Sequence, residues 1–277
     1  MVKGNVKVSI VILNYMNYAE TIKCVDSVLK QKYTNYDILI VDNGSDNESF
    51  AILKREYKAA SNVYVIHSRE NYGFARGNNI GISYAKKYLK AEFVLLLNSD
   101  TIMIQDDYIE KMLSEFSYDV GVIGSRIINR NGSEFRFNRD YCEFPATVYF
   151  YFYLIATHMG LEGISIYFER LLSKYKRTEI LHGCNWLITP AYFEHYNMLF
   201  DKTFLYSEEN ILYIRCAMSG IRQKKAKEAQ ILHTGKQSSK YLFGNKSDMR
   251  EKYILSSYKY VVILSFVQFL IGQFRKG

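Results

Sequence analysis

The chain has 277 residues, of which 48% are hydrophobic, so it is long enough and apolar enough to bury one large core. Its four cysteines are widely spaced without a Cys-x-x-Cys pair, which argues against a zinc site or a disulfide framework and favours reduced thiols in the cytoplasm. The formal net charge of +8 suits anionic membranes or polyanionic substrates, and because no segment matches a nucleic-acid-binding module we expect no nucleic-acid partner.

The first half of the chain alternates between short apolar runs and segments with helical periodicity. The predicted strands are 7–13, 38–41, 63–67, 93–97 and 120–123, and the predicted helices are 19–31, 49–57, 76–89 and 105–116. This alternation predicts an α/β fold with a Rossmann-like, mostly parallel central sheet flanked by helices. Residues 1–5 lead directly into the first strand and leave no room for a signal peptide, so we expect no secretion by that route.

The second half of the chain is less regular. Order fades after Asn129 and returns with a predicted strand at 183–188 and a predicted helix at 210–218. Near the end, an apolar stretch at 260–271 lies between Lys259 and the pair Arg275-Lys276, and it is predicted to be too short to span a bilayer. With two prolines and no Gly/Ser-rich tract, the chain is expected to form one continuous unit.

Two predicted strands end in acidic residues. The run 93–97 is followed by Asn98-Ser99-Asp100, and the run 38–41 is followed by Asp42. The carboxyl ends of parallel strands share one edge of a sheet, where α/β folds bind their ligands. We therefore expect both carboxylates at that edge, in a place that suits a cation-bound nucleotide diphosphate.

The loop after the first strand limits which nucleotide can bind. It has no glycine, which argues against the dinucleotide-binding turn of a Rossmann enzyme. The chain also lacks the Gly-x-x-x-x-Gly-Lys-[Ser/Thr] sequence of a P-loop. A bound phosphate therefore needs another countercharge, and a divalent cation held by Asp100 would supply it.

Four motifs in order carry a resemblance to a known family. They are residues 8–15, 42–45, 71–79 and 98–101, and the similarity continues through 183–188, 204–209 and His233. In these residues the chain resembles the family 2 inverting glycosyltransferases, with the rhamnosyltransferase-like branch as the most similar. The resemblance implies a GT-A fold and transfer of a sugar from a nucleoside diphosphate, dTDP-rhamnose or a UDP-hexose, with inversion at the anomeric carbon.

The resemblance also implies a set of donor-binding residues. These are Asn14, Tyr15 and Asp42 for the base and ribose, Arg76 and Asn78 for phosphate or sugar hydroxyls, and Asn98 for the ribose or the metal shell. Asp42 also suits a turn or a helix cap, because Asp-Asn-Gly-Ser is strong turn chemistry. Arg76 stands where the family usually has a small residue, so it either reshapes the donor pocket or faces solvent.

The Asn-Ser-Asp segment matches the metal-binding Asp-x-Asp position of the family, with asparagine in place of the first aspartate. Asp100 is thereby implied to bind Mn²⁺ or Mg²⁺, and His233 matches a late histidine that approaches the metal or the diphosphate. The loss of one negative charge should weaken the metal site when no donor is present. The alternatives are a strand-end turn for Asp100 and a structural role for His233.

Inverting transfer requires a carboxylate that accepts the proton of the acceptor hydroxyl. The family's Glu-Asp-x-Asp stretch reads Glu208-Glu209-Asn210-Ile211 here, which implies Glu209 as the base and Glu208 as the alternative. Two solvated acids at the first turn of the next helix are the other interpretation. Trp186, the single tryptophan, is predicted to form the floor of the acceptor site or to pack in the core.

The resemblance assigns residues 1–240 to a catalytic domain, with a nucleotide-sugar-binding half at 1–128 and an acceptor-binding half at 129–240. Residues 241–277 form a predicted C-terminal helical segment. The apolar stretches 144–161 and 260–271 predict peripheral attachment at the inner face of the cell membrane. They would lie beside a lipid-linked or oligosaccharide acceptor of bacterial surface polysaccharide synthesis. Core helices or a homodimer interface are the alternative.

Two rival functions remain open. A non-catalytic membrane-associated scaffold derived from such an enzyme fits the departures at Glu209 and Ile211. A nucleotidyltransferase fits less well, because it would require a glycine-rich, basic loop after the first strand.

Overall fold

The described residues of the computed structural model, 5–135, 138–235 and 247–274, contain one eight-stranded sheet and one two-stranded ribbon. The strands of the sheet, in spatial order, are β3 (Val63–His67), β2 (Tyr36–Asp42), β1 (Val8–Asn14), β4 (Phe93–Asn98), β9 (Asn185–Ile188), β6 (Val120–Ile128), β10 (Arg222–His233) and β5 (Thr101–Met103). The ribbon pairs β7 (Asn138–Asp140) with β8 (Thr178–Ile180).

The first four strands of this order are parallel and end at the same edge. In the register of the sheet, Asn14 of β1 lies beside Asp42 of β2, and Asp42 lies beside His67 of β3. On the other side of β1, Leu13 pairs with Asn98 of β4. The polar residues that follow each apolar strand are thereby brought together at the carboxyl edge, as expected for a parallel sheet.

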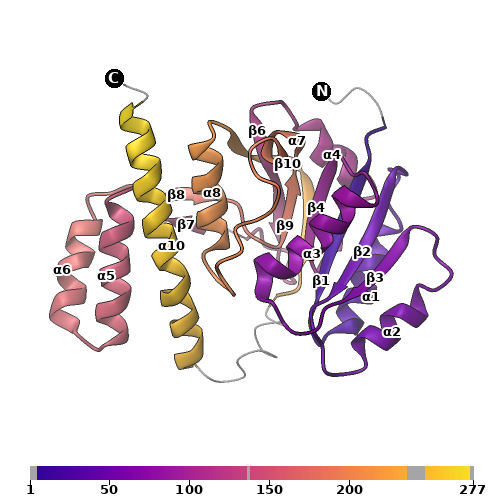
Figure 1. The fold of residues 1–277 in the computed structure, drawn as a ribbon, viewed down its shortest axis with the longest axis horizontal. Coiled ribbons are helices and arrows are strands. Elements are labelled where there is room, and N and C mark those ends of the chain that lie inside the picture. Colours follow the sequence, from indigo (N-terminus) through magenta and orange to yellow (C-terminus); the bar gives the residue numbers. More distant parts are fainter. Residues whose placement is uncertain (1–4, 136–137, 236–246, 275–277) are drawn as a thin grey trace.

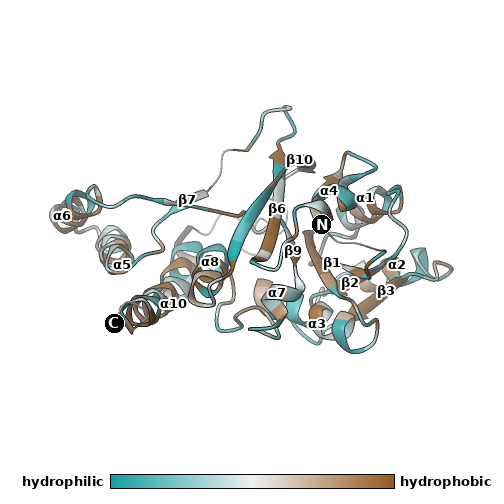
Figure 2. Ribbon diagram, turned by 90° about the horizontal axis from the view of Figure 1, so that it is seen from above, coloured by the Kyte–Doolittle hydropathy of each residue, from teal (hydrophilic) through white to brown (hydrophobic). Residues whose placement is uncertain are grey.

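The next strands bring the second half of the chain to the same edge. Strand β9 runs antiparallel to β4, with Leu97 opposite Asn185, so the residues just before β9 lie at the end of β4. Strand β10 pairs with β6 and β5 and places His233 opposite Thr101. Much of β10 is hydrophilic, in contrast to the apolar β1 (Figure 2).

Alternate residues of the buried strands face two separate helical layers. The first layer consists of α1 (Tyr18–Val28), α2 (Ser49–Glu56) and α4 (Tyr108–Ser114), which share a core with Ile10 and Ile12 of β1. The second consists of α3 (Gly73–Lys87), α7 (Pro190–Phe193) and α8 (Glu208–Met218), which share a core with Val11 of β1. The predicted α/β class with a mostly parallel central sheet is confirmed.

Three further helices lie at the end of the molecule farthest from β3 (Figure 1). Helices α5 (Ala146–His158) and α6 (Glu162–Leu172) form a hairpin, and α10 (Ser247–Phe274) packs between α5 and α8. Tyr258 and Val261 of α10 are buried in this contact, and the hydroxyls of Ser265 and Thr147 lie 2.6 Å apart.

The apolar C-terminal stretch is longer than the sequence suggested. Helix α10 has 28 residues, and its part Met249–Phe274 is long and apolar enough to cross a membrane by length and composition alone. The expectation of a stretch too short to span was therefore wrong, because the helix continues through mixed residues before 260. The predicted boundary at 241 and the pair Arg275-Lys276 lie outside the described residues.

Candidate active site

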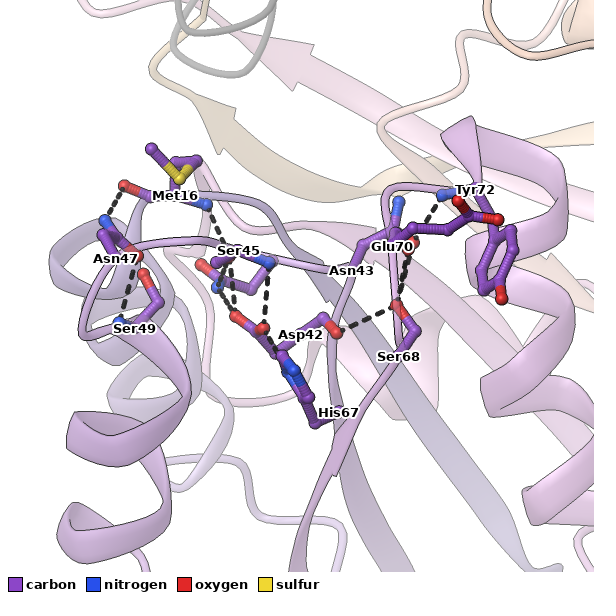
Figure 3. Close-up of polar contacts among 11 residues, drawn as sticks. Met16, Asp42, Asn43, Ser45, Asn47, Ser49, His67, Ser68, Glu70 and Tyr72 are labelled. Carbon is purple, nitrogen blue, oxygen red and sulfur yellow. Dashed lines mark hydrogen bonds and ion pairs between the residues drawn. The ribbon is translucent and has the colours of Figure 1, made fainter.

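Asp42 is completely buried at the end of β2, where several groups donate to its carboxylate (Figure 3). Its Oδ2 accepts hydrogen bonds from Asn14 Nδ2 at 2.6 Å and from Ser45 Oγ at 2.8 Å. Its Oδ1 lies 2.9 Å from His67 Nδ1, and Asn14 is oriented in turn by the hydroxyl of Thr21 at 2.8 Å. If Asp42 binds the nucleotide base, as the family resemblance implies, the base must displace one of these hydrogen-bond partners.

The sequence analysis did not identify His67 as a partner of Asp42, and the register of the sheet explains why the two side chains meet. It is the last residue of β3 and pairs directly with Asp42. Tyr15 follows β1 on the same edge and is half-buried, and the next residue, Met16, has a φ of 60°. Of the two residues, Tyr15 is therefore the more exposed, because Asp42 is completely buried.

Arg76 and Asn78 lie in the first turns of α3, which begins three residues before the predicted start at 76. The helix begins at Gly73, whose φ of 78° allows the chain to turn and Phe74 N–H to bond the Phe204 carbonyl at 2.8 Å. Asn78 is buried, and its Nδ2 donates to the carbonyl of Phe74 one turn earlier. The guanidinium of Arg76 is exposed and lies 4.5 Å from the ring centre of Tyr72.

Asp100 and His233 come together although they are far apart in the sequence. Asp100 Oδ1 lies 3.2 Å from His233 Nε2, and the Asp100 carbonyl accepts the N–H of Thr234 at 2.9 Å. Asn98 is half-buried beside them and donates its main-chain N–H to Cys184 O at 3.0 Å. A carboxylate oxygen next to an imidazole nitrogen is a donor set that fits a divalent cation.

Two more potential ligands lie at this position. The ligand atoms of His182, Cys184 and His233 lie within 4.8 Å of one another, and the two imidazole rings are 5.4 Å apart between centres. Burial lowers the pKa of His182, which favours the neutral imidazole. In the sequence, the segment His-Gly-Cys directly before β9 could have indicated these potential ligands. It was interpreted only as the start of the strand predicted at 183–188.

Glu208 and Glu209 lie in different surroundings. They begin α8 after Tyr206 and Ser207, whose φ values of 72° and 66° are left-handed. Glu209 is half-buried, and its Oε1 accepts the Gly183 N–H at 3.2 Å. Glu208 is buried, and burial together with the neighbouring Glu209 charge raises its pKa well above the usual range. The helix thus starts two residues earlier than predicted, with the carboxyl of Glu208 buried and that of Glu209 half-buried.

Trp186 lies in the core of the sheet. Its side chain is 1% exposed, and its ring makes an edge-to-face contact with Phe74 at 5.7 Å between centres. A stacking platform for a sugar needs an open ring face, so this position fits the core interpretation of Trp186 and gives no support to an acceptor contact.

Comparison with known proteins identifies the family. Residues 9–197 match the sequence model described as glycosyl transferase family 2. The chain belongs to this family. The chain is similar to the low-salt glycan biosynthesis hexosyltransferase Agl10 of Haloferax volcanii, with 27% identity over 225 residues, 81% of this chain and 66% of the relative.

A second similar protein is the glycosyltransferase GlyG of Streptococcus pneumoniae serotype 4, with 29% identity over 141 residues, 49% of this chain and 45% of that protein. The chain thus spans about two thirds or less of the length of these relatives. Among solved structures, the mannosyltransferase PcManGT from Pyrobaculum calidifontis, in complex with GDP-Man and Mn²⁺, has a similar fold. The TM-score is 0.58 at 12% identity, covering 95% of this chain and 73% of that one, which supports the GT-A assignment.

Proposed function

We propose that the chain is an inverting glycosyltransferase that uses a nucleoside diphosphate sugar, dTDP-rhamnose or a UDP-hexose, as its donor. The acceptor is a lipid-linked saccharide or oligosaccharide of cell-surface polysaccharide synthesis. The observation that carries this proposal is the meeting of Asp100, His233 and Glu209 around residues 182–184 on a family 2 domain.

Different residues have different roles in the proposed in-line displacement. Glu209 takes the proton of the acceptor hydroxyl, and the Gly183 N–H holds its Oε1 in place. Glu208 is buried, and burial raises its pKa and disfavours the charged form that a base requires. A divalent cation, Mn²⁺ or Mg²⁺, would be held by Asp100 and His233 and would neutralise charge on the leaving diphosphate.

Thermal stabilisation by donors tests the proposed site. The melting temperature of the wild-type chain and of Asp100→Asn is measured with nucleoside diphosphates and nucleotide sugars, each with and without Mn²⁺ or Mg²⁺. A ligand that binds only the folded chain stabilises it by mass action, by about 2.7 kcal/mol at a hundred times its Kd, and thereby raises the melting temperature. We expect a metal-dependent shift with dTDP or UDP compounds in wild type and a much smaller shift in Asp100→Asn.

No shift with any donor would instead favour the non-catalytic scaffold. The base is tested separately by comparing Glu209→Gln with Glu208→Gln in a transfer assay. Loss of a general base costs roughly 100- to 10,000-fold in kcat, and we expect that loss only in Glu209→Gln, with its donor-induced shift retained. The reverse pattern would transfer the role of base to Glu208.

The proposal includes peripheral contact with the inner face of the cell membrane. It is supported by apolar side chains exposed on α10, among them Ile263, Leu270 and Phe274, and by others on the α5–α6 hairpin. Burial of Tyr258 and Val261 keeps the opposite side of α10 against the protein. A membrane surface at this end would present a lipid-linked acceptor to the chain.

A further inference from the structure

His182, Cys184 and His233, which we call the His–Cys–His cluster, form a potential ligand set of two imidazoles and one thiol. His182 and Cys184 directly precede β9 and His233 ends β10, two strands of the same sheet that are separated by β6. Cys184 O accepts the Asn98 N–H at 3.0 Å, which ties the cluster to the end of β4. His233 is held in the register of β10 opposite Thr101.

The His182 ring is oriented by the backbone next to it. Its Nδ1 accepts the main-chain N–H of Cys184 at 3.1 Å. This bond fixes the ring, and because Nδ1 is the acceptor, the neutral imidazole carries its proton on Nε2. A cation would bind at the Nδ1 lone pair and take the place of the Cys184 N–H.

Asn185 gives the sulfur a similar partner. Its Nδ2 donates to Cys184 Sγ at 3.2 Å, and its Oδ1 accepts the Ser125 N–H at 2.8 Å and is 3.3 Å from the Tyr108 hydroxyl. The amide is buried and its orientation is fixed by these two donors. Burial raises the pKa of the Cys184 thiol, and the amide donor offsets this only in part, so the thiolate that binds a metal forms as the metal displaces the proton.

We propose that the His–Cys–His cluster binds a borderline-soft divalent cation, Zn²⁺ or one of similar chemistry, through Cys184 Sγ and the two imidazoles. Asp100, 3.2 Å from His233 Nε2, lies beside the fourth position. Thiolate and imidazole prefer Zn²⁺, whereas carboxylate and water suit Mn²⁺ and Mg²⁺. On binding, the S–H bond of Cys184 breaks, the sulfur keeps the electron pair for the metal, and the proton leaves to the buffer.

This site goes beyond the proposed function, because its ligand set needs neither donor nor acceptor. The two sites share His233, so Zn²⁺ in the cluster removes that ligand from the cation proposed to act with the donor. Zn²⁺ is therefore expected to compete with Mn²⁺ or Mg²⁺.

Titration of the metal-free full chain with Co²⁺ tests the cluster without any nucleotide sugar. A thiolate ligand gives Co²⁺ a sulfur-to-metal charge-transfer absorption that oxygen and nitrogen ligands do not produce. We expect this absorption in wild type and in the control Cys216→Ala, which removes a buried cysteine of α8 outside the cluster. Cys184→Ala should lose the absorption and weaken Co²⁺ binding by about 100-fold or more.

X-ray absorption of the Zn²⁺-loaded wild type needs no variant and so remains decisive if Cys184→Ala fails to fold. One sulfur neighbour at about 2.3 Å is expected. Zinc with only oxygen and nitrogen neighbours, or charge transfer that persists in folded Cys184→Ala, overturns the proposal. Because both experiments omit the donor, they can fail while the nucleotide-dependent stabilisation succeeds, and the reverse also holds.

Discussion

Glu208 and Glu209 show how strongly one position in a helix decides the chemistry of a carboxyl. The first glutamate of α8 lines a small cavity together with Arg215 and apolar side chains that include Trp186 and Leu212. The second reaches Gly183 at the edge of the sheet. The direction of the pKa shift at Glu208 and the hydrogen bond at Glu209 therefore give the two acids separate tasks.

The buried acid predicts a pH dependence of stability. The pKa of Glu208 is higher in the folded chain than in the unfolded one, so its favourable contribution is complete below the unfolded pKa. That contribution is lost as the pH rises from the unfolded pKa through the folded one, with a slope of at most about 1.4 kcal/mol per pH unit. Glu208→Gln removes this loss and should be more stable than wild type at pH 8.

Thermal melts at pH 5 and pH 8 measure the effect. The difference in melting temperature between Glu208→Gln and wild type should grow with pH. Glu169→Gln, at an exposed position of α6, is the control and should show the same difference at both pH values. A Glu208→Gln curve parallel to wild type would mean that Glu208 is ionised in the folded chain.

A substitution at Gly183 tests how precisely the Glu209 carboxylate must be positioned to act as the base. A Cβ at this residue would lie 3.1 Å from Glu209 Oε1, although the backbone itself is not left-handed and accepts alanine. Gly183→Ala should push the carboxylate aside and lower kcat by up to about 100-fold, because small misplacements of catalytic groups are costly. Gly163→Ala, with nothing within 4 Å, should leave kcat unchanged in the same transfer assay. Equal kcat in the two variants would contradict the role given to Glu209.

At the scale of elements, the strands that could be predicted are those that are apolar throughout. Strand β4 is buried except for Asn98, and its run of apolar residues also marks where the sheet edge and Asp100 lie. Strand β3 was predicted over the bounds observed, 63–67. The part of the candidate site in the first half of the chain could be predicted from these strands, because each polar residue directly after them lies at the carboxyl edge of the sheet.

The second half was harder to predict because its elements lack a clear period. Helix α5 is apolar or aromatic on all sides and has no polar face to reveal its turns. Strand β10 contains Lys224, Lys225 and Lys227 and resembles an exposed loop in sequence, yet it positions His233. Strands β7 and β8 have three residues each, too few for an alternation to be recognised. Cys184 was overlooked for another reason: only the fold brings it near His233.

Gly73 links two elements and predicts a large loss of stability when it is substituted. Its φ is +78°, and a Cβ there would lie 2.0 Å from the carbonyl oxygen of Phe204. Gly132 has a similar φ of +80° but nothing within 4 Å, so it isolates the cost of the backbone conformation. That cost is about 1–2 kcal/mol for an L-residue.

Gly73→Ala should therefore lower the free energy of unfolding by at least about 2 kcal/mol more than Gly132→Ala, since backbone atoms must move. Urea denaturation of the two variants and wild type measures the difference. The start of α3 and the loop before α8 should move apart in Gly73→Ala, which would also weaken donor-induced stabilisation. An equal decrease in the free energy of unfolding in both variants would show that the backbone at Phe204 moves away at little energetic cost.

The whole molecule is asymmetric in its exposed apolar surface. Among the described residues, 12 of the 17 large hydrophobic side chains with high exposure lie on α5, α6, α10 or the short connection between α5 and α6. These helices lie together at the end away from β3 (Figure 1). Exposed apolar surface gathered at one end indicates an interaction surface, while scattered hydrophobic residues need no explanation.

The proposed membrane contact predicts flotation of the chain with anionic liposomes at low salt. Ile263, Leu270 and Phe274 follow each other at helical spacing on α10 and are 54%, 39% and 85% exposed. Substituting all three with serine removes apolar area that would be buried in lipid, which should weaken binding by roughly 10- to 100-fold. The packed residues Tyr258 and Val261 are untouched, so the fold should be preserved.

The matched control replaces Tyr88, Ile104 and Tyr118 with serine, because these side chains are 60%, 49% and 80% exposed on other parts of the surface. It should bind liposomes as wild type does. If both triple variants float equally well, the apolar end does not contact the lipid, and an interface between two copies of the chain becomes the better account. Sedimentation should then show that wild type is a dimer and the α10 variant a monomer, since the substituted side chains would be buried in the dimer interface.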